Sequence, residues 1–261
     1  MHIRRGLQVA CYGLVKALRR PQRERDEPIR TPRFFIVFIS LGVAGEKTTD
    51  PMNRMNKLNH FTTFSAVKGI LKEGMRFSTG CNWQDRNDAE LLALYREITG
   101  NINTGVLCFL NDDETVYHWT YFSKDDLKEA CCIEFKKKEL LQKYLYNEDF
   151  LCQEVQYDVL KEVHFSTPNE LLFTKRHPYR FEREYRIVSL NGGYIQVKDY
   201  INKITLSPDL SEKEYKQRKQ DLLTEFGLTC DINQSTVFEN SEWIGKAKEL
   251  KLREINFINQ K

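Results

Sequence analysis

A short charged segment before a glycine turn places the strongest constraint on how this chain can fold. Residues 180–190 read Arg-Phe-Glu-Arg-Glu-Tyr-Arg-Ile-Val-Ser-Leu, and Asn-Gly-Gly follows. The aromatic and β-branched residues predict a strand, and the glycines predict a tight turn after it. Because side chains alternate across a strand, Glu182, Glu184 and Arg186 would share one face.

Two carboxylates and an arginine on one strand face allow two interpretations. Buried charges are costly unless they are paired, so the face could be an exposed one with Glu–Arg pairs between strands. Alternatively, the rigid strand holds a carboxylate at the mouth of a cleft, where it binds a hydroxyl group or stabilises a cation.

Composition restricts the class of protein. The chain has 261 residues and is 41% hydrophobic, which is enough for one large domain or two small ones. Its seven cysteines are scattered without a Cys-x-x-Cys pair, and His164 and His177 have no partners at metal-ligand spacing. We therefore expect reduced thiols in a cytoplasmic protein without a metal site. The longest apolar run, residues 34–44, is shorter than the roughly 20 residues of a membrane span, so we expect no membrane association.

Residues 1–51 differ from the rest of the chain. Residues 1–33 carry a formal charge of +6, and the remainder carries −3. This proline-marked run has no sustained apolar period and predicts a disordered extension, or translated upstream sequence, since Met52 and Met55 stand just before the patterned region. A basic tail that binds nucleic acid is the alternative. We expect residues 52–261 to form a single α+β domain.

Short strands and a few helices follow one another irregularly from residue 58 onward. A helix should begin after Thr63 or Ser65 and end at Gly74. The apolar patterns predict strands at 58–62, 75–78, 106–110, 131–135, 203–207 and 230–238, one or two more in 150–163, helices at 89–98, 138–146 and 211–226, and a hairpin strand at 193–197 that pairs back on the Glu-x-Glu strand. Without strict βαβ alternation, this mixture predicts an α+β fold with antiparallel or mixed sheets.

Three features along this pattern could carry chemistry. His60 lies on an early strand, an aromatic cluster occupies residues 117–122, and Glu182 and Glu184 lie late in the chain. Each also has a structural interpretation: a satisfied core histidine, core packing of the rings, and paired strand charges. Their order along the chain favours a site.

Several blocks resemble a widespread bacterial family of unknown function, whose members open with Tyr-His-Tyr-Thr. Residues 58–63 match this opening, and residues 76–78 match its Arg-Phe-Ser. Residues 132–135 match its middle block, residues 175–188 its Glu-x-Glu-Tyr-Arg-Ile block, and residues 204–207 a following strand. Asn87-Asp88 is similar to the family's Asn-Asp-Pro-Phe element but lacks the Pro-Phe.

The family pattern is in turn similar to the ADP-ribosyltransferase fold with a His, Tyr, Glu triad. This resemblance implies a mixed or antiparallel split sheet with flanking helices, NAD as substrate and no metal. It implies that Glu184 holds the nicotinamide-ribose 2′-hydroxyl and stabilises an oxocarbenium-like state, while Glu182 orients the nucleophile. It also implies that His60 takes part in catalysis. The NAD contacts that it implies are His60 and Thr62 at the adenosine ribose, Arg76 and Ser78, and Trp119 or Tyr121 against the nicotinamide ring.

One departure concerns residues 119–122, which read Trp-Thr-Tyr-Phe where family members commonly have Trp-Ser-His-Tyr. The change implies an altered acceptor or a lost activity. The hypothesis is an NAD-dependent ADP-ribosyltransferase, acting on a protein or nucleic acid as a bacterial toxin or anti-phage effector with a neutralising partner protein.

Two other functions remain open at this point. One is a non-catalytic module that binds a nucleotide or a partner, in which Glu182, Glu184 and Arg186 form a structural ion-pair network. The other is a metal-independent RNase-type effector that uses His60, Glu184 and Arg186.

Overall fold

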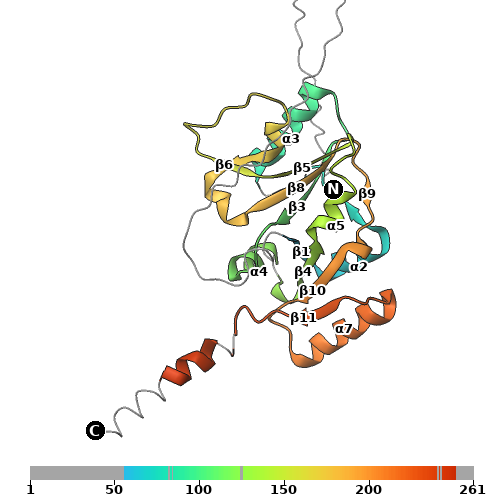
Figure 1. Ribbon diagram of the computed structural model, residues 1–261, viewed down its shortest axis with the longest axis vertical. Helices are drawn as coiled ribbons and strands as arrows, with labels where there is room; N and C mark the ends of the chain where they lie inside the picture. Colours follow the sequence, from blue (N-terminus) through green and yellow to red (C-terminus); the bar gives the residue numbers. More distant parts are fainter. Residues whose placement is uncertain are drawn as a thin grey trace, which may run out of the picture. The chain divides into compact units, whose positions relative to one another are not determined.

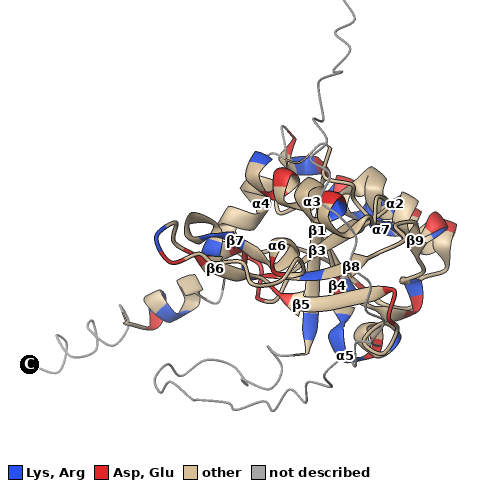
Figure 2. Cartoon of the chain, turned by 90° about the horizontal axis from the view of Figure 1, so that it is seen from above, with Lys and Arg blue, Asp and Glu red and all other residues tan. Residues whose placement is uncertain are grey.

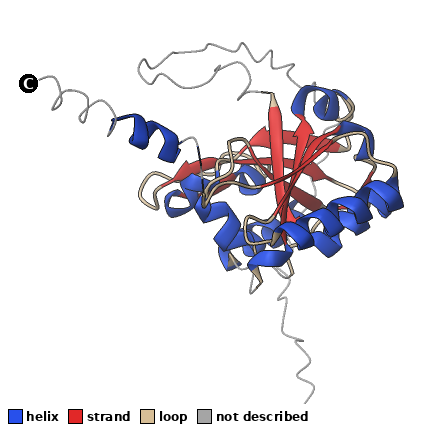
Figure 3. Ribbon diagram, turned by 90° about the horizontal axis from the view of Figure 1, so that it is seen from below, coloured by secondary structure: helices blue, strands red, loops and turns tan. Residues whose placement is uncertain are grey.

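The computed structural model describes residues 56–81, 83, 85–123, 126–239, 241 and 243–250. The predicted extension at residues 1–51 lies outside these residues, and the single domain at 52–261 stays a prediction. The described part is an α+β structure around one large, mostly antiparallel sheet with flanking helices (Figure 1, Figure 3). The predicted fold class is confirmed.

The central sheet has seven strands in the order β11-β10-β4-β1-β3-β8-β5. These strands are β1 (Lys57–Thr63), β3 (Gly105–Leu110), β4 (Ala130–Lys136), β5 (Phe150–Glu154), β8 (Glu184–Ser189), β10 (Ile201–Leu206) and β11 (Asp231–Gln234). The pairs within it are antiparallel, except that β10 and β11 run parallel.

The sheet is almost divided between β1 and β3. Strand β1 pairs with β4 along its whole length, but it shares with β3 only the register pair of Asn59 and Leu110. Beyond this pair, the two halves separate. The split separates β11-β10-β4-β1 from β3-β8-β5 and leaves an opening beside His60 and Cys108.

Local sequence signals explain where the main helices begin and end. Helix α2 (Phe64–Glu73) begins where the Thr63 hydroxyl accepts a bond from the Ala66 N–H, and it ends at Gly74. Helix α3 (Arg86–Thr99) has Asp85 as its N-cap and a left-handed Gly100 after its end. Helix α7 (Glu212–Phe226) begins with a capping box and ends at a left-handed Gly227.

The remaining elements are short. They are β2 (Met75–Arg76), α4 (Val116–Phe122), η1 (Leu127–Glu129), α5 (Lys137–Gln142), β6 (Gln156–Asp158), α6 (Glu170–Phe173), β7 (Thr174–Arg176), η2 (His177–Glu182), β9 (Tyr194–Ile195) and η3 (Lys198–Tyr200). Helix α5 and strand β11 stop earlier than the sequence predicts. No helix in the described ranges is long and apolar enough to cross a bilayer.

Two sequence predictions around the Glu-x-Glu segment are wrong. The strand does not include Glu182, because residues 177–182 form a 3₁₀ helix with Pro178 in its first turn, and Arg183 then adopts a left-handed backbone with φ 41°. Strand β8 therefore begins at Glu184. Strand β9 pairs with β2 and not with β8, so the expected hairpin does not form.

Hydrophobic side chains cover both faces of the sheet. Ile187 belongs to a large core that includes Val67 and Leu71 of α2 and Leu222 of α7. The next residue of β8, Val188, belongs to a second core with residues of α3 and α6. Both faces of β8 are therefore buried, and the packing on each face holds the side chains of this strand in place.

We predict that Gly74→Ala destabilises the protein by roughly 1–3 kcal/mol, measured by urea unfolding. Gly74 has φ 95° and ψ 176°, a conformation essentially restricted to glycine, and an added Cβ would collide with the Ile195 carbonyl oxygen. The matched control is Gly69→Ala within α2, where an added Cβ meets no atom within 4 Å. The control should stabilise by about 0.5–1 kcal/mol. Equal effects at both positions would contradict this account.

Candidate active site

A cleft of about 290 Å³ lies at the opening between β1 and β3. Its walls come from β1, β3, β7, β8, α3, α4 and η2. The lining residues are His60, Phe61, Trp83, Asp85, Asp88, Cys108, Phe109, Leu110, Tyr121, Phe122, Lys175, Glu182 and Glu184. Four residues predicted from the sequence, His60, Tyr121, Glu182 and Glu184, are thus brought together in one cavity.

His60 reaches the cleft as a neutral hydrogen-bonding ring. Its Nδ1 lies 2.9 Å from the carbonyl oxygen of Cys108. A carbonyl only accepts, so Nδ1 carries the proton and Nε2 is left as an acceptor. Burial lowers the pKa of His60, although the Cys108 carbonyl opposes this effect. The ring is therefore suited to accept a hydrogen bond from a ligand hydroxyl.

Glu184, the first residue of β8, is held as an anion by two cations. Its Oε1 accepts from Arg186 Nε at 2.7 Å, and its Oε2 accepts from Lys175 Nζ at 3.2 Å and from Arg186 at 3.1 Å. Burial alone would raise the pKa of Glu184, but the charges of Arg186 and Lys175 outweigh it and lower the pKa to about 2. The backbone N–H of Glu184 also donates to the Tyr157 hydroxyl at 2.8 Å.

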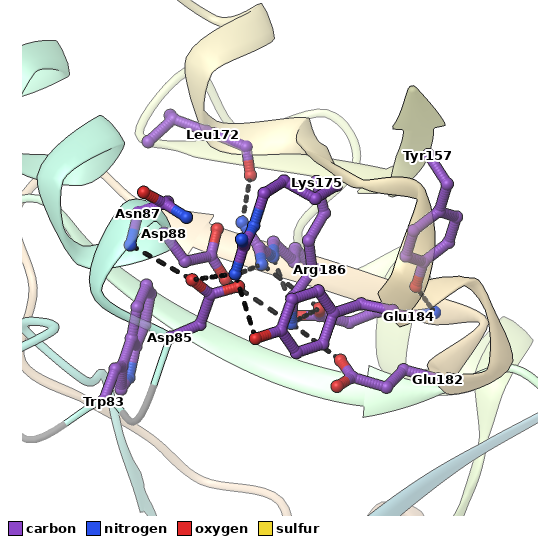
Figure 4. A network of polar contacts seen from close by, with 12 residues as sticks. Trp83, Asp85, Asn87, Asp88, Tyr157, Leu172, Lys175, Glu182, Glu184 and Arg186 are labelled. Carbon is purple, nitrogen blue, oxygen red and sulfur yellow. Dashed lines mark hydrogen bonds and ion pairs between the residues drawn. The ribbon is translucent and has the colours of Figure 1, made fainter. Parts of the chain in front are cut away.

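Arg186 is fully buried and connects β8 to α3 and α6 (Figure 4). Its guanidinium donates to Asp88 Oδ2 at 2.5 Å and to the Leu172 carbonyl at 2.7 Å. Lys175 Nζ lies 2.7 Å from Glu182 Oε2 and 3.6 Å from Asp88 Oδ2. Three carboxylates thus surround two cations, and this ion cluster of Asp88, Lys175, Glu182, Glu184 and Arg186 has a formal charge of −1.

Glu182 enters the cleft from the end of η2 and not from the strand. Burial raises the pKa of Glu182, and the neighbouring charge of Lys175 opposes that rise. Tyr121 lies on α4. Burial raises the pKa of its phenol, and the nearby negative charge of Glu182 raises it further. Tyr121 therefore stays neutral and can donate a hydrogen bond. Glu182 and Glu184 differ in environment although they are two residues apart.

Four other residues that were expected to contact NAD do not line the cleft. Trp119 is buried in the core, packs edge-on against Phe61 with ring centres 5.2 Å apart, and donates from Nε1 to Glu114. Thr62 lies on β1 opposite Cys131.

Arg76 and Ser78 complete this group. Arg76 is exposed on β2, with its guanidinium 6.0 Å from the centre of the Tyr194 ring. Ser78 acts indirectly, because its hydroxyl accepts a 2.8 Å bond from Trp83 Nε1 and so orients a ring that does line the cleft.

Sequence reasoning missed Asp88 and Lys175 as members of the site. Asn87-Asp88 resembles a family block but carries no sign of a buried charge. Lys175 belongs to a basic stretch with Arg176, Arg180 and Arg183, and these three arginines are exposed. The Lys175 side chain, in contrast, is only 9% exposed. No local signal distinguishes Lys175, because its acidic partners come from three different elements.

We predict that Arg186→Met lowers the free energy of unfolding by about 3–5 kcal/mol, because Glu184 and Asp88 lose their buried counter-charge. Arg180→Met, the same substitution at an exposed position nearby, should change it by less than about 0.5 kcal/mol. Chemical denaturation of both variants measures the difference. A small loss for Arg186→Met would contradict the role assigned to this ion cluster.

We predict that the loss of folding stability in acid depends on the ionisation of Glu184. Because its folded-state pKa of about 2 is below the ordinary value of 4.5, its ionisation stabilises the fold above pH 4.5. This contribution is lost progressively as the pH falls from 4.5 to 2. Unfolding free energies measured across this range should decline in the wild type and decline less steeply in Glu184→Gln. Parallel pH curves would contradict the prediction.

Comparisons with known proteins give structural likeness at low sequence identity. No protein-family model matches the sequence, and no curated protein matches it. Among solved structures, the chain is similar to Thermus sp. 2.9 DarT in complex with NAD+, with 10% identity, a TM-score of 0.41, and coverage of 69% of this chain and 96% of that chain. Thermus sp. 2.9 DarT in complex with ADP-ribosylated ssDNA matches with 12% identity, a TM-score of 0.41, and coverage of 73% of this chain and 98% of that chain.

Proposed function

We propose that the protein is an NAD-dependent ADP-ribosyltransferase that acts on a protein or nucleic-acid acceptor. The observation that carries this proposal is the convergence of His60, Tyr121, Glu182 and Glu184 on one cleft. These side chains come from β1, α4, η2 and β8, so no shared local structure explains why they meet. The proposed chemistry needs no metal.

Glu184 supports the chemistry of breaking the bond between nicotinamide and ribose. As nicotinamide leaves with the bonding electron pair, positive charge develops on the ribose. A carboxylate that is already ionised and fixed on a rigid strand stabilises this charge without reorganising. The formal −1 of the surrounding ion cluster adds to the same field.

The cleft also has groups that fit the nicotinamide riboside half of NAD. Its volume of about 290 Å³ is at the small end of ligand pockets, so the adenosine half would extend outside it. Nε2 of His60 would accept from a ribose hydroxyl, and the ring of Tyr121 would pack against nicotinamide. Asp88 Oδ1 is buried without a hydrogen-bond partner in the described structure, which leaves an acceptor for a ligand donor.

The rim of the cleft favours a nucleic-acid acceptor within this proposal. Phe181 is 55% exposed and Tyr117 37% exposed, and their ring centres lie 5.9 Å apart. The Arg180 guanidinium lies 5.0 Å from the Phe181 ring, and Arg183 is exposed beside it. Exposed rings next to guanidinium groups form stacking platforms for unpaired bases. Figure 2 shows that acidic residues also lie close to the basic ones around β6 and β7. The surface suited to a nucleic acid is therefore limited to the exposed rings and arginines at the rim.

The role as a bacterial toxin or anti-phage effector, restrained by a neutralising partner protein, is part of the same proposal. It rests on the resemblance of the Tyr-His-Tyr-Thr-like opening and the Glu-x-Glu block. A cell-growth assay with an inducible gene tests it: the wild type should arrest growth, and Glu184→Gln should not.

A non-catalytic binding module is the second candidate function. The observation that favours it is the ion cluster itself, in which every oxygen of Glu184 is already bonded to a cation. In that case, the cluster has a structural role and substitution of Glu184 removes stability without removing any activity.

Nicotinamide release from NAD by the full-length protein separates the two functions. We expect release by the wild type and a loss of at least about 100-fold in Glu184→Gln. The matched control is Glu134→Gln, the same change at a buried position of β4 outside the cleft lining, which should keep its activity. If folded wild type neither releases nicotinamide nor binds NAD in calorimetry, the transferase proposal fails and the binding module is favoured. RNA cleavage without NAD would instead support an RNase.

The acceptor prediction uses the exposed ring beside Glu182. Phe181→Ala should lower ADP-ribose transfer to a single-stranded oligonucleotide by about tenfold, since a stacked base contributes roughly 1–3 kcal/mol. Nicotinamide release into water should not change, because Phe181 is outside the cleft lining. Phe238→Ala, at another exposed phenylalanine, is the control. Unchanged transfer by Phe181→Ala would contradict a nucleic-acid acceptor at this rim.

A further inference from the structure

Lys175 occupies an unusual position for a lysine. It lies on the short strand β7, and its side chain is only 9% exposed. Its ammonium group is within 4 Å of three carboxylates, at 2.7 Å from Glu182, 3.2 Å from Glu184 and 3.6 Å from Asp88. The Tyr179 ring covers the ammonium with a ring centre 4.9 Å away. The three carboxylates match the three N–H donors of the ammonium group, so Lys175 links η2, β8 and α3 at the cleft.

We propose that Lys175 is a positioning residue of the cleft, whose ammonium group holds Glu182 next to Glu184 and keeps Glu182 ionised. This role rests on the proposed function, because ionised Glu182 would accept the proton of the incoming nucleophile. In that step, the acceptor oxygen or nitrogen forms a bond to the ribose carbon and its proton passes to Glu182. The bond to nicotinamide breaks, and its electron pair leaves with nicotinamide.

The charges around Glu182 support this assignment. Lys175 is the cation closest to Glu182, and Glu184 and Asp88 are the like charges that oppose its ionisation. Without Lys175, the three carboxylates would be balanced by Arg186 alone, and burial together with repulsion would favour protonated Glu182. Arg186 cannot replace Lys175, because its donors already contact Glu184, Asp88 and the Leu172 carbonyl.

Besides Lys175, Glu184 and Asp88, phenols that stay neutral at pH 7 lie near Glu182. Burial, followed by the Glu182 charge, raises the pKa of Tyr117 to about 12 and also raises that of Tyr121, both on α4. Burial likewise raises the pKa of Tyr157 on β6. Two further cleft residues could produce an acidic limb in a pH profile: His60, whose pKa burial lowers, and Glu184, whose pKa is lowered by Arg186 and Lys175. An activity profile must therefore be accompanied by a direct measurement on Glu182.

The experiment compares Lys175→Met with Lys175→Arg in the full-length protein. The pH profile of nicotinamide release and transfer should move its acidic limb upward by about one pH unit or more in Lys175→Met, with recovery of rate at alkaline pH. Lys175→Arg keeps the positive charge and should keep the limb near that of the wild type. A purely structural role would lower the folded fraction in Lys175→Met and leave the limb unmoved, which would overturn the proposal.

A second measurement does not depend on activity. The pKa of Glu182 is followed by ¹³C-carboxyl NMR, with Glu182→Gln to assign the signal, and it should rise in Lys175→Met by the same interval. An unchanged pKa overturns the role of Lys175, whether or not the wild type releases nicotinamide. Absence of nicotinamide release at every pH would defeat the proposed function separately.

A double variant tests the proposal even if Lys175→Met folds poorly. Adding Glu182→Gln removes the charge that Lys175 balances, so stability should be partly restored. Additive losses of stability in the two single variants would overturn the proposal.

Discussion

The buried contact between Arg186 and Glu184 is the interaction on which the rest of the site depends. The guanidinium bonds Glu184 on its own strand, Asp88 on α3 and the Leu172 carbonyl at the end of α6. The Arg186 guanidinium is buried away from water, so these bonds supply the hydrogen-bond partners that water would otherwise provide. Arg186 therefore fixes α3 and α6 against β8 and, by the same contacts, fixes the carboxylate that faces the cleft.

The opening between β1 and β3 determines where that carboxylate can act. A fully paired sheet would place neighbouring strands about 4.8 Å apart and leave no space for a ligand. Here, β1 and β3 share the register pair of Asn59 and Leu110, and the His60 imidazole bonds the Cys108 carbonyl across the opening. A break in the ladder thus becomes a cavity whose two walls are held rigidly by β4 on one side and β8 on the other.

The sequence predicts the parts of this arrangement that depend on neighbouring residues. The start and end of α7 follow from Ser211 and Gly227, and the strand character of β8 follows from its apolar residues. Glu182 was placed on the strand because alternation was extended across Arg183, whose left-handed backbone ends it. The burial of Lys175 was also not predictable, because Asp88 approaches it only after α3 has packed.

The aromatic cluster shows the same limit. Trp119 and Tyr121 were left as alternatives for the stacking residue, and both belong to α4. Residues two positions apart on a helix point in different directions, so one can face the core while the other faces the cleft. The sequence does not say which, whereas the structure buries Trp119 against Phe61 and places Tyr121 in the cleft lining.

The charge balance of the ion cluster distinguishes a structural role from a catalytic one. A buried network is least costly when its charges cancel, yet three carboxylates here face two cations. The additional negative charge destabilises the protein when no ligand is bound. It becomes favourable when a positive group enters the cleft, as the nicotinamide ring of NAD and the ribose cation would. The imbalance suits the proposed transferase, and the Lys175 ammonium between Glu182 and Glu184 reduces the repulsion of their carboxylates.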